Sequence, residues 1–321
     1  ITGTMITISS NTWITMWAGL EINLLSIIPL MSNLKNKMET EAAMKYFITQ
    51  AMASTILMLA IVIILSNNNN LMTSKTPSML MDIAVLTKMG AAPMHFWFPE
   101  VMEGLSWINS MIMLTWQKIG PMIVFMYTNK STMFTMIIIL TSVTISGILG
   151  INQNSMRKIL AYSSINHIGW MISTMLINQT LWIIYFIIYS LMTINITTMF
   201  KMNNVYFSSQ MINSMNNNKP MKIIFTMNFL SLGGMPPFIG FFPKWITINN
   251  LIQEKFFMLT TVMILMTLIT LAFYLRLVFS SSVMMTSESS QTNYNKNYKT
   301  MIMNFTTLSM LSLCPMMISF I

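Results

Sequence analysis

The feature that most constrains the fold of this chain is its almost unbroken series of long apolar segments. A helix that spans a bilayer needs about 20 consecutive, mostly apolar residues, and such segments fill nearly all of the 321 residues. Only 8% of the residues are charged, whereas an ordinary soluble domain has about 25%. Because so few charges cannot cover a soluble surface of this size, we predict an all-α, polytopic membrane protein.

Short polar stretches divide the chain into about eleven transmembrane helices. None of these stretches is long enough to form a soluble domain. We therefore predict a single transmembrane domain over residues 1–321. The predicted helices are 1–10, 12–31, 42–65, 77–96, 106–127, 131–150, 156–176, 180–200, 221–252, 256–280 and a C-terminal helix 300–320.

Two of these helices contain the same interruption, G-x-x-P-x-x-x-x-F-P, at an offset of 144 residues. Proline breaks helices because it lacks the backbone donor and clashes with the preceding turn. Our count of crossings makes the two copies run in opposite directions, and paired broken helices mark ion or substrate sites in transporter folds. A chance match is the alternative, since glycine and proline are common in membrane helices. We predict inverted-repeat broken helices near 77–100 and 221–252, with the motif residues Gly90, Pro93, Phe98 and Pro99 recurring at Gly234, Pro237, Phe242 and Pro243.

The basic residues indicate an orientation rather than a nucleic-acid partner. The net charge of +9 comes from lysines and arginines spread over many short loops, whereas a nucleic-acid surface gathers them on one face. In membrane proteins the more basic loops face the interior side. With eleven crossings, this rule places the N-terminus inside and the C-terminus outside.

Five ionisable residues fall within the apolar segments, where a central charge costs about 2.5–3.5 kcal/mol on insertion scales. A glutamate and a lysine that approach each other favour both charged forms, so a pair that separates can load and release a proton. A broken helix also frees backbone groups to face internal water. We predict a proton path, and the alternative is a set of buried ion pairs that only holds helices together. The residues are Glu21, Lys88, Lys118, His167 and Lys244.

Other polar residues give weaker signals. Asp82 lies near a predicted helix start, so we expect it at the membrane interface. We expect Glu100 and Glu103 to anchor a loop at the water boundary. His95 fits a proton relay and an interfacial hydrogen bond equally well, and Lys201 receives no role.

The chain shows no redox apparatus. Iron–sulfur clusters need several cysteines, and Cys314 is the single cysteine. The two histidines form no haem pair that the sequence supports, and neither common glycine-rich nucleotide loop is present. We therefore expect no cofactor, no metal and no soluble small-molecule substrate. Any redox energy must reach this chain through coupling to other proteins.

Six segments keep a common order and spacing from about residue 10 to residue 280. They are WAGLEINLLSIIPL (17–30), EAAMKYFITQAMAST (41–55), KMGAAPMHFWFPEVMEGL (88–105), TWQKIGPM (115–122), NQNSMRKILAYSSINHIGWM (152–171) and LSLGGMPPFIGFFPKW (230–245). Together they closely resemble the family of mitochondrially encoded NADH dehydrogenase (ubiquinone) subunit 2, a core membrane subunit of respiratory complex I. The composition, with 40 methionines, is similar to arthropod-type members.

The resemblance implies an antiporter-like fold and a place in the mitochondrial inner membrane. It implies a matrix-side N-terminus and an intermembrane-space-side C-terminus. The implied partners are other complex I membrane subunits, accessory subunits and phospholipids. FMN, Fe–S clusters and ubiquinone would belong to other subunits.

The resemblance also assigns roles by position. Glu21 and Lys88 would form the input pair, Lys118 and His167 would relay, and Lys244 would gate the exit. The implied function is proton translocation through a buried Glu/Lys/His/water path, within NADH:ubiquinone oxidoreductase but without an electron carrier in this chain. The alternatives are a stand-alone cation/proton antiporter and a structural membrane scaffold.

Overall fold

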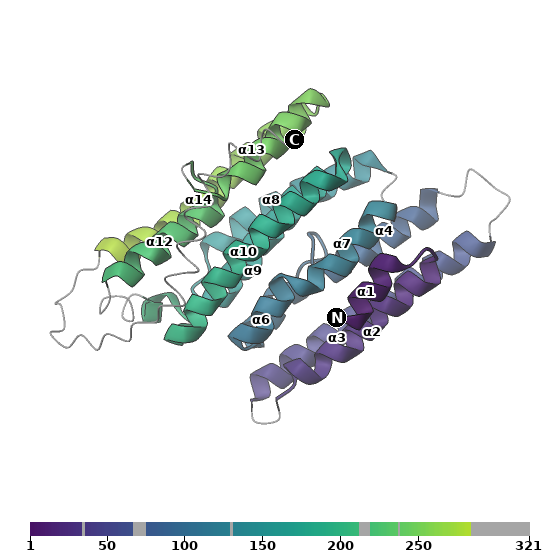
Figure 1. Ribbon diagram of the computed structural model, residues 1–321, viewed down its shortest axis with the longest axis horizontal. Coiled ribbons are helices and arrows are strands. Elements are labelled where there is room, and N and C mark those ends of the chain that lie inside the picture. Colours follow the sequence, from purple (N-terminus) through teal and green to yellow (C-terminus); the bar gives the residue numbers. More distant parts are fainter. Residues whose placement is uncertain (34–35, 67–74, 129–130, 212–218, 237, 284–321) are drawn as a thin grey trace. The chain divides into compact units, whose positions relative to one another are not determined.

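The structure, a computed structural model, describes residues 1–33, 36–66, 75–128, 131–211, 219–236 and 238–283 (Figure 1). These ranges form helices joined by short connections. Within them, the one β-type contact is an isolated antiparallel bridge between Ser155 and Phe207. The predicted all-α class is confirmed for this part of the chain.

The chain divides into two compact units, Ile1–Ser142 and Val143–Ile321, and each is described by itself. The single domain predicted for residues 1–321 stays a prediction. Unit 1 contains α1 (Thr2–Ser9), α2 (Trp13–Met31), α3 (Lys37–Ser66), α4 (Lys75–Met89), α5 (Trp97–Gly104), α6 (Trp107–Leu114) and α7 (Trp116–Thr128). The boundary falls within α8 (Thr132–Ile151), and unit 2 continues with α9 (Met156–Ile177), α10 (Gln179–Asn203), α12 (Lys219–Gly233), α13 (Phe241–Gln253) and α14 (Phe257–Val283).

Five helices in the described ranges are long and apolar enough to cross a bilayer. They are α2, α3, α8, α10 and the Phe257–Ser280 part of α14. The shorter helices include the halves of the interrupted segments. The predicted helix 300–320 lies outside the described residues, so the count of about eleven helices stays a prediction.

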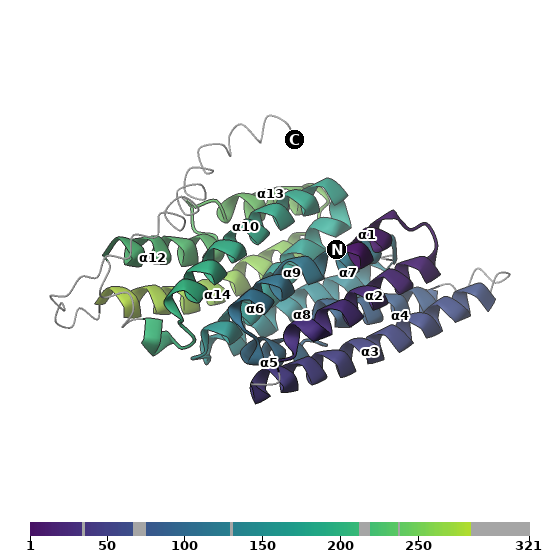
Figure 2. The same ribbon diagram turned by 60° about the horizontal axis from the view of Figure 1, so that its bottom comes forward.

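Helix α3 shows how this fold reverses the pattern of a soluble protein. In unit 1, α3 lies beside α2 and α4 in both views (Figures 1 and 2). Its polar residues Gln50 and Ser54 are buried, whereas Met52, Leu59 and Val62 are more than half exposed. Contiguous exposed apolar surface of this kind suits contact with lipid, because apolar side chains do not have to be buried within the protein when lipid surrounds them.

Both predicted broken helices are confirmed, and their breaks share one backbone geometry. Directly after α4 comes Gly90 with φ +75°, and directly after α12 comes Gly234 with φ +78°. In each break, the amide of the glycine donates to the carbonyl of the residue three positions earlier. The amide of the residue that follows the glycine donates to the carbonyl of the residue five positions before it. This is the paired hydrogen bonding that closes helices at a left-handed residue, a conformation that glycine adopts at little cost. Pro237 lies outside the described residues, and the opposite direction of the two copies stays a prediction.

The predicted single helix 106–127 is wrong in one respect, because it is divided into α6 and α7 at Thr115. The Thr115 amide and hydroxyl both donate to the Met111 carbonyl, at 3.1 and 2.8 Å. A threonine that bonds back to the preceding turn bends a helix, and here it ends α6. The division places Lys118 in the first turn of α7.

We predict that Gly234→Ala destabilises the chain while Gly233→Ala does not. An L-residue in the left-handed region costs about 1–2 kcal/mol, and a Cβ at Gly234 would lie 2.9 Å from both Cδ and Nζ of Lys244. A Cβ at Gly233 meets only ordinary contacts, the nearest being Tyr274 at 3.4 Å. The measurement is the midpoint for loss of soluble chain on heating in detergent. Equal midpoints for the two variants would contradict this account of the break.

Candidate functional site

The five residues predicted for the proton path divide between the two units. Glu21, Lys88 and Lys118 lie in unit 1, and His167 and Lys244 lie in unit 2. The lysines at 88, 118 and 244 are 7%, 2% and 5% exposed, and His167 is 1% exposed. Long charged side chains are almost never buried to this degree without a partner. The partners therefore decide what each group can do.

In unit 1 the structure brings Lys88 and Glu21 close enough to interact electrostatically. Lys88 occupies the last turn of α4, directly before the break, and its carbonyl accepts from Gln50 Nε2 at 3.4 Å. Lys88 Nζ and Glu21 Oε2 are buried, and neither makes a hydrogen bond to the described residues. The two groups therefore form a charge-coupled pair without a direct hydrogen bond. Such a pair responds to small changes in separation or to water between its members.

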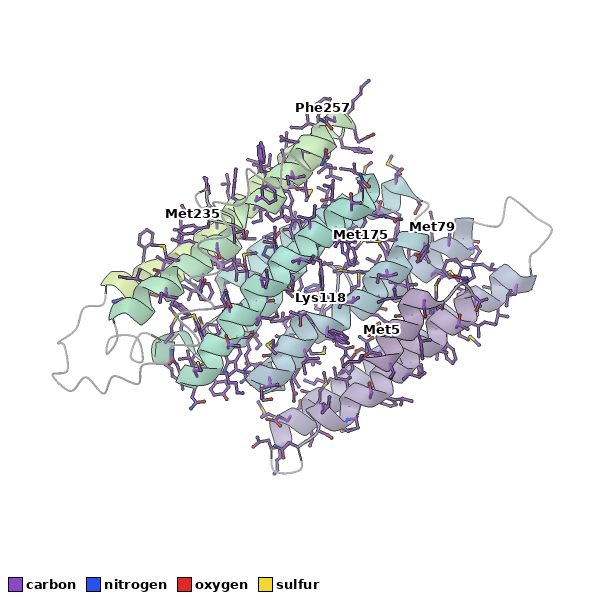
Figure 3. The ribbon with its side chains drawn as sticks, viewed as in Figure 1. Met5, Met79, Lys118, Met175, Met235 and Phe257 are labelled. Carbon is purple, nitrogen blue, oxygen red and sulfur yellow. The ribbon has the colours of Figure 1, made fainter. Side chains whose placement is uncertain are left out.

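Lys118 contacts the second half of the first broken helix. Its Nζ lies 5.6 Å from the centroid of the Phe98 ring, within cation–π range. Phe98 is a buried member of the repeated motif on α5. Figure 3 labels Lys118 on α7. The contact couples the position of this cation to that of the broken helix.

A partly buried amide cluster beside these charges was not predicted. Asn23 and Gln117 bond to each other reciprocally at 2.8 and 3.3 Å, and Tyr46 OH donates to Gln117 Oε1 at 3.4 Å. The cluster ties α2, α7 and α3 together next to Glu21 and Lys118 in sequence. Uncharged polar residues within apolar helices are the signal that could have revealed it.

In unit 2, His167 lies in a pocket of tyrosines. Every residue of α9 from 161 to 174 is buried, although this stretch contains several polar side chains. His167 Nδ1 lies 2.9 Å from Tyr185 OH, and the Tyr189 ring centroid is 5.0 Å from the imidazole centroid. Either atom of the Nδ1–OH pair can donate, depending on the tautomer. The hydroxyl of Tyr185 is thus a hydrogen-bonding partner of His167 that sequence reasoning missed.

Lys244 reaches back across the second break. It lies on α13, and its Nζ donates to the Gly233 carbonyl at 2.9 Å. This carbonyl belongs to the C-terminal turn of α12, where the helix dipole favours a cation. The Nζ also lies 5.9 Å from the Trp170 ring centroid, three residues beyond His167 on α9. A carbonyl and an aromatic ring therefore compensate the Lys244 charge.

The structure also places the polar residues that gave weaker signals in the sequence. The side chain of Asp82 is 1% exposed, two turns into α4, so it is packed inside unit 1. Its expected place at the membrane interface stays a prediction. Glu100 does act as an anchor, although it lies on helix α5 and not in a loop, and it pairs with Lys45 at 2.8 Å. His95 is buried with Nδ1 3.2 Å from the Pro93 carbonyl oxygen, and Lys201 is exposed.

No group of three or more His, Cys, Asp or Glu side chains in the described ranges is arranged to hold a metal ion. The absence of a cofactor from the whole chain stays a prediction.

The fold and site are those of an antiporter-like membrane protein, in which broken helices carry buried lysines. The family model "NADH:quinone oxidoreductase/Mrp antiporter, TM" matches residues 10–270. The chain belongs to this family and, within it, groups with the proteins called NADH-ubiquinone oxidoreductase chain 2.

Two insect relatives and one solved structure illustrate the similarity. NADH-ubiquinone oxidoreductase chain 2 of Anopheles gambiae is 46% identical over 300 residues, which cover 92% of this chain and 85% of the relative. Its Locusta migratoria counterpart is 44% identical over 311 residues, or 97% and 91% of the two chains. A chain of respiratory complex I from Thermus thermophilus with bound aureothin superposes with a TM-score of 0.85. That match has 18% identity and covers 97% of this chain and 75% of the other.

We predict that Tyr185→Phe lowers thermal stability more than Tyr127→Phe does. Both changes keep the ring, but the first leaves His167 Nδ1 without its 2.9 Å hydroxyl partner in a buried setting. A buried polar group left unsatisfied costs about 1–3 kcal/mol. Tyr127 is 54% exposed, so water replaces what its hydroxyl loses. Heating each variant in detergent gives the comparison, and equal midpoints would refute the importance of the Tyr185–His167 contact.

Proposed function

We propose that this chain is a proton-translocating core subunit of NADH:ubiquinone oxidoreductase, complex I, in the mitochondrial inner membrane. The observation that carries the proposal is the buried Lys88, which ends the first half of a broken helix and interacts with Glu21. The family membership and the named relatives support the same assignment. The chain contributes proton movement to an enzyme whose redox chemistry takes place in other subunits.

The Glu21–Lys88 pair performs the first step. The Glu21 carboxylate stabilises the Lys88 ammonium while the two are close. If the carboxylate is protonated or moves away, that stabilisation is lost and the buried ammonium releases its proton more readily. Since Lys88 Nζ is buried and makes no hydrogen bond to the described residues, water can take the place of a partner when the pair opens. A change at Glu21 is thereby converted into a change in proton occupancy at Lys88.

The other residues of the path act through local contacts of the same kind. Lys118 contacts the Phe98 ring, so a movement of α5 changes the surroundings of the Lys118 ammonium. In unit 2, His167 exchanges a hydrogen bond with Tyr185. The Gly233 carbonyl stabilises the Lys244 ammonium, so a shift of α13 relative to α12 changes the proton affinity of Lys244. We propose the order Glu21, Lys88, Lys118, His167 and Lys244, with Lys244 at the exit.

The driving energy and the partners lie outside this chain. We propose contacts with other complex I membrane subunits, accessory subunits and phospholipids. The cofactors FMN, Fe–S clusters and ubiquinone belong to other subunits. The proposed orientation has the N-terminus on the matrix side and the C-terminus on the intermembrane-space side, in keeping with the distribution of basic loops.

The scaffold alternative is less well supported because it requires buried ion pairs. The two ion pairs that the described residues show, from Lys45 to Glu41 and to Glu100, are exposed. Exposed pairs contribute only about 0–1 kcal/mol. A buried ammonium such as Lys88 without a direct pair costs stability, so a role in holding the fold together does not account for it.

We predict that Lys88→Met lowers proton pumping while the complex still assembles. A positioned proton carrier contributes a factor on the order of 10²–10⁴ to its step, so we expect at least about a tenfold fall in coupled turnover. Removal of the buried charge leaves packing intact, because methionine fills nearly the same volume. The measurement is NADH-driven acidification in vesicles, normalised to the NADH-active band on a native gel.

The exposed Lys201, changed to Met in the same way, is the matched control and should pump normally. Normal pumping by an assembled Lys88→Met complex would remove Lys88 from the path. Migration of the unmodified chain as a small species without NADH activity would instead favour the stand-alone antiporter.

A further inference from the structure

Unit 1 contains a buried acid that the path described above does not use. Asp82 is 1% exposed, and both of its carboxylate oxygens are buried without a hydrogen bond of ordinary geometry to the described residues. The polar group that interacts with it is the hydroxyl of Thr128, at the C-terminal end of α7. An acid placed so deeply, with one hydroxyl beside it, calls for a physical account.

A narrow apolar hollow lies near Asp82. Its lining includes Met81 and Val85 of α4, Leu20 of α2 and Thr128 of α7. Met81 precedes Asp82 in sequence and Val85 lies one turn after it, while Leu20 precedes Glu21. The hollow therefore lies beside Thr128 and beside sequence neighbours of Asp82 and Glu21, but neither acid is among its lining residues. No void within it is as large as a water molecule, so its apolar lining must shift before water enters.

The spacing along α4 sets the relation between the two ionisable groups. Asp82 and Lys88 are six residues apart, which is about 9 Å of helix rise. That distance is too long for direct proton transfer but short for an electrostatic interaction through protein. An uncompensated carboxylate in such a site is costly, so the group binds a proton when no cation is near. The spacing along α4 would therefore let a charge on Lys88 influence the proton on Asp82.

We propose that Asp82 is a further proton-binding residue of unit 1, exchanging a proton with the Glu21–Lys88 pair by way of the Thr128 end of α7. The proposal rests on the proposed function. On release, the proton leaves the carboxyl oxygen of Asp82, which becomes a carboxylate, and passes to an adjacent hydroxyl or water oxygen. The Thr128 hydroxyl donates to the Phe125 carbonyl at 3.2 Å, so its oxygen is available to accept from the Asp82 acid. The competing explanation is a permanently neutral acid that only fills space beside Thr128.

Asp82→Asn separates these explanations, because asparagine matches the neutral acid in shape but cannot exchange a proton. The variant is made in the full chain within the assembled complex, and NADH-driven acidification of vesicles is measured per NADH-active complex. We expect a fall of at least about fivefold in coupled turnover, below the factor of about 10²–10⁴ that a positioned proton carrier contributes to its own step. Asp82→Glu restores the carboxyl and should recover more than half of the rate. Glu254→Gln, an exposed acid-to-amide change at the end of α13, is the matched control and should leave the rate unchanged.

Thr128 provides a second test that does not alter the acid. Thr128→Val removes the hydroxyl and should slow turnover, whereas Thr128→Ser keeps it and should not. Normal turnover per assembled complex in Asp82→Asn overturns the proposal, as does an equal loss in Asp82→Asn and Asp82→Glu. If Lys88→Met lowers pumping and Asp82→Asn does not, only the role of Asp82 fails. If neither variant lowers pumping, the proposed function of the site fails as well.

Discussion

A lysine ammonium inside a membrane protein requires a compensating group, and this requirement shapes both broken helices. In the first, Lys88 ends a helical half and interacts with the charge of Glu21 on another helix. In the second, Lys244 begins a helical half and reaches back to the Gly233 carbonyl. The glycine at each break gives the chain a left-handed turn, and at the second break Lys244 bonds to the carbonyl just before that turn. The same local backbone geometry therefore supports two electrostatic solutions, one based on a charge and one on a helix end.

The two solutions differ in how a signal could act on them. A charge pair without a hydrogen bond is sensitive to the ionisation of its partner, so Lys88 can respond to chemistry at Glu21. A carbonyl does not ionise, so the Gly233 contact makes Lys244 sensitive to movement of α13 against α12. The aromatic contacts of Lys118 with Phe98 and of Lys244 with Trp170 make both cations sensitive to ring position as well. In the function that we propose, these contacts link proton occupancy to helix position within each unit.

Much of this arrangement could be predicted from local sequence. Apolar length indicated the helices, and glycine with proline indicated the breaks, because both effects act within one or two turns of backbone. The division at Thr115 escaped notice because a threonine that bonds back to the preceding carbonyl resembles any other threonine in sequence. The burial of Asp82 was not predicted because its position near a helix start says nothing of the helix that covers it. Tyr185 was missed because its partner His167 lies on a different helix.

The sequence by itself determined that this chain lives in a membrane, where its helices break and which ionisable residues its apolar segments contain. Those properties depend on composition and on the backbone freedom of individual residues. Only the tertiary structure decided which group compensates each buried charge, since the carboxylate, ring, hydroxyl or carbonyl comes from another helix or from across a break. Packing also decided that Asp82 is buried beside Thr128, because burial depends on neighbours that the local sequence does not name.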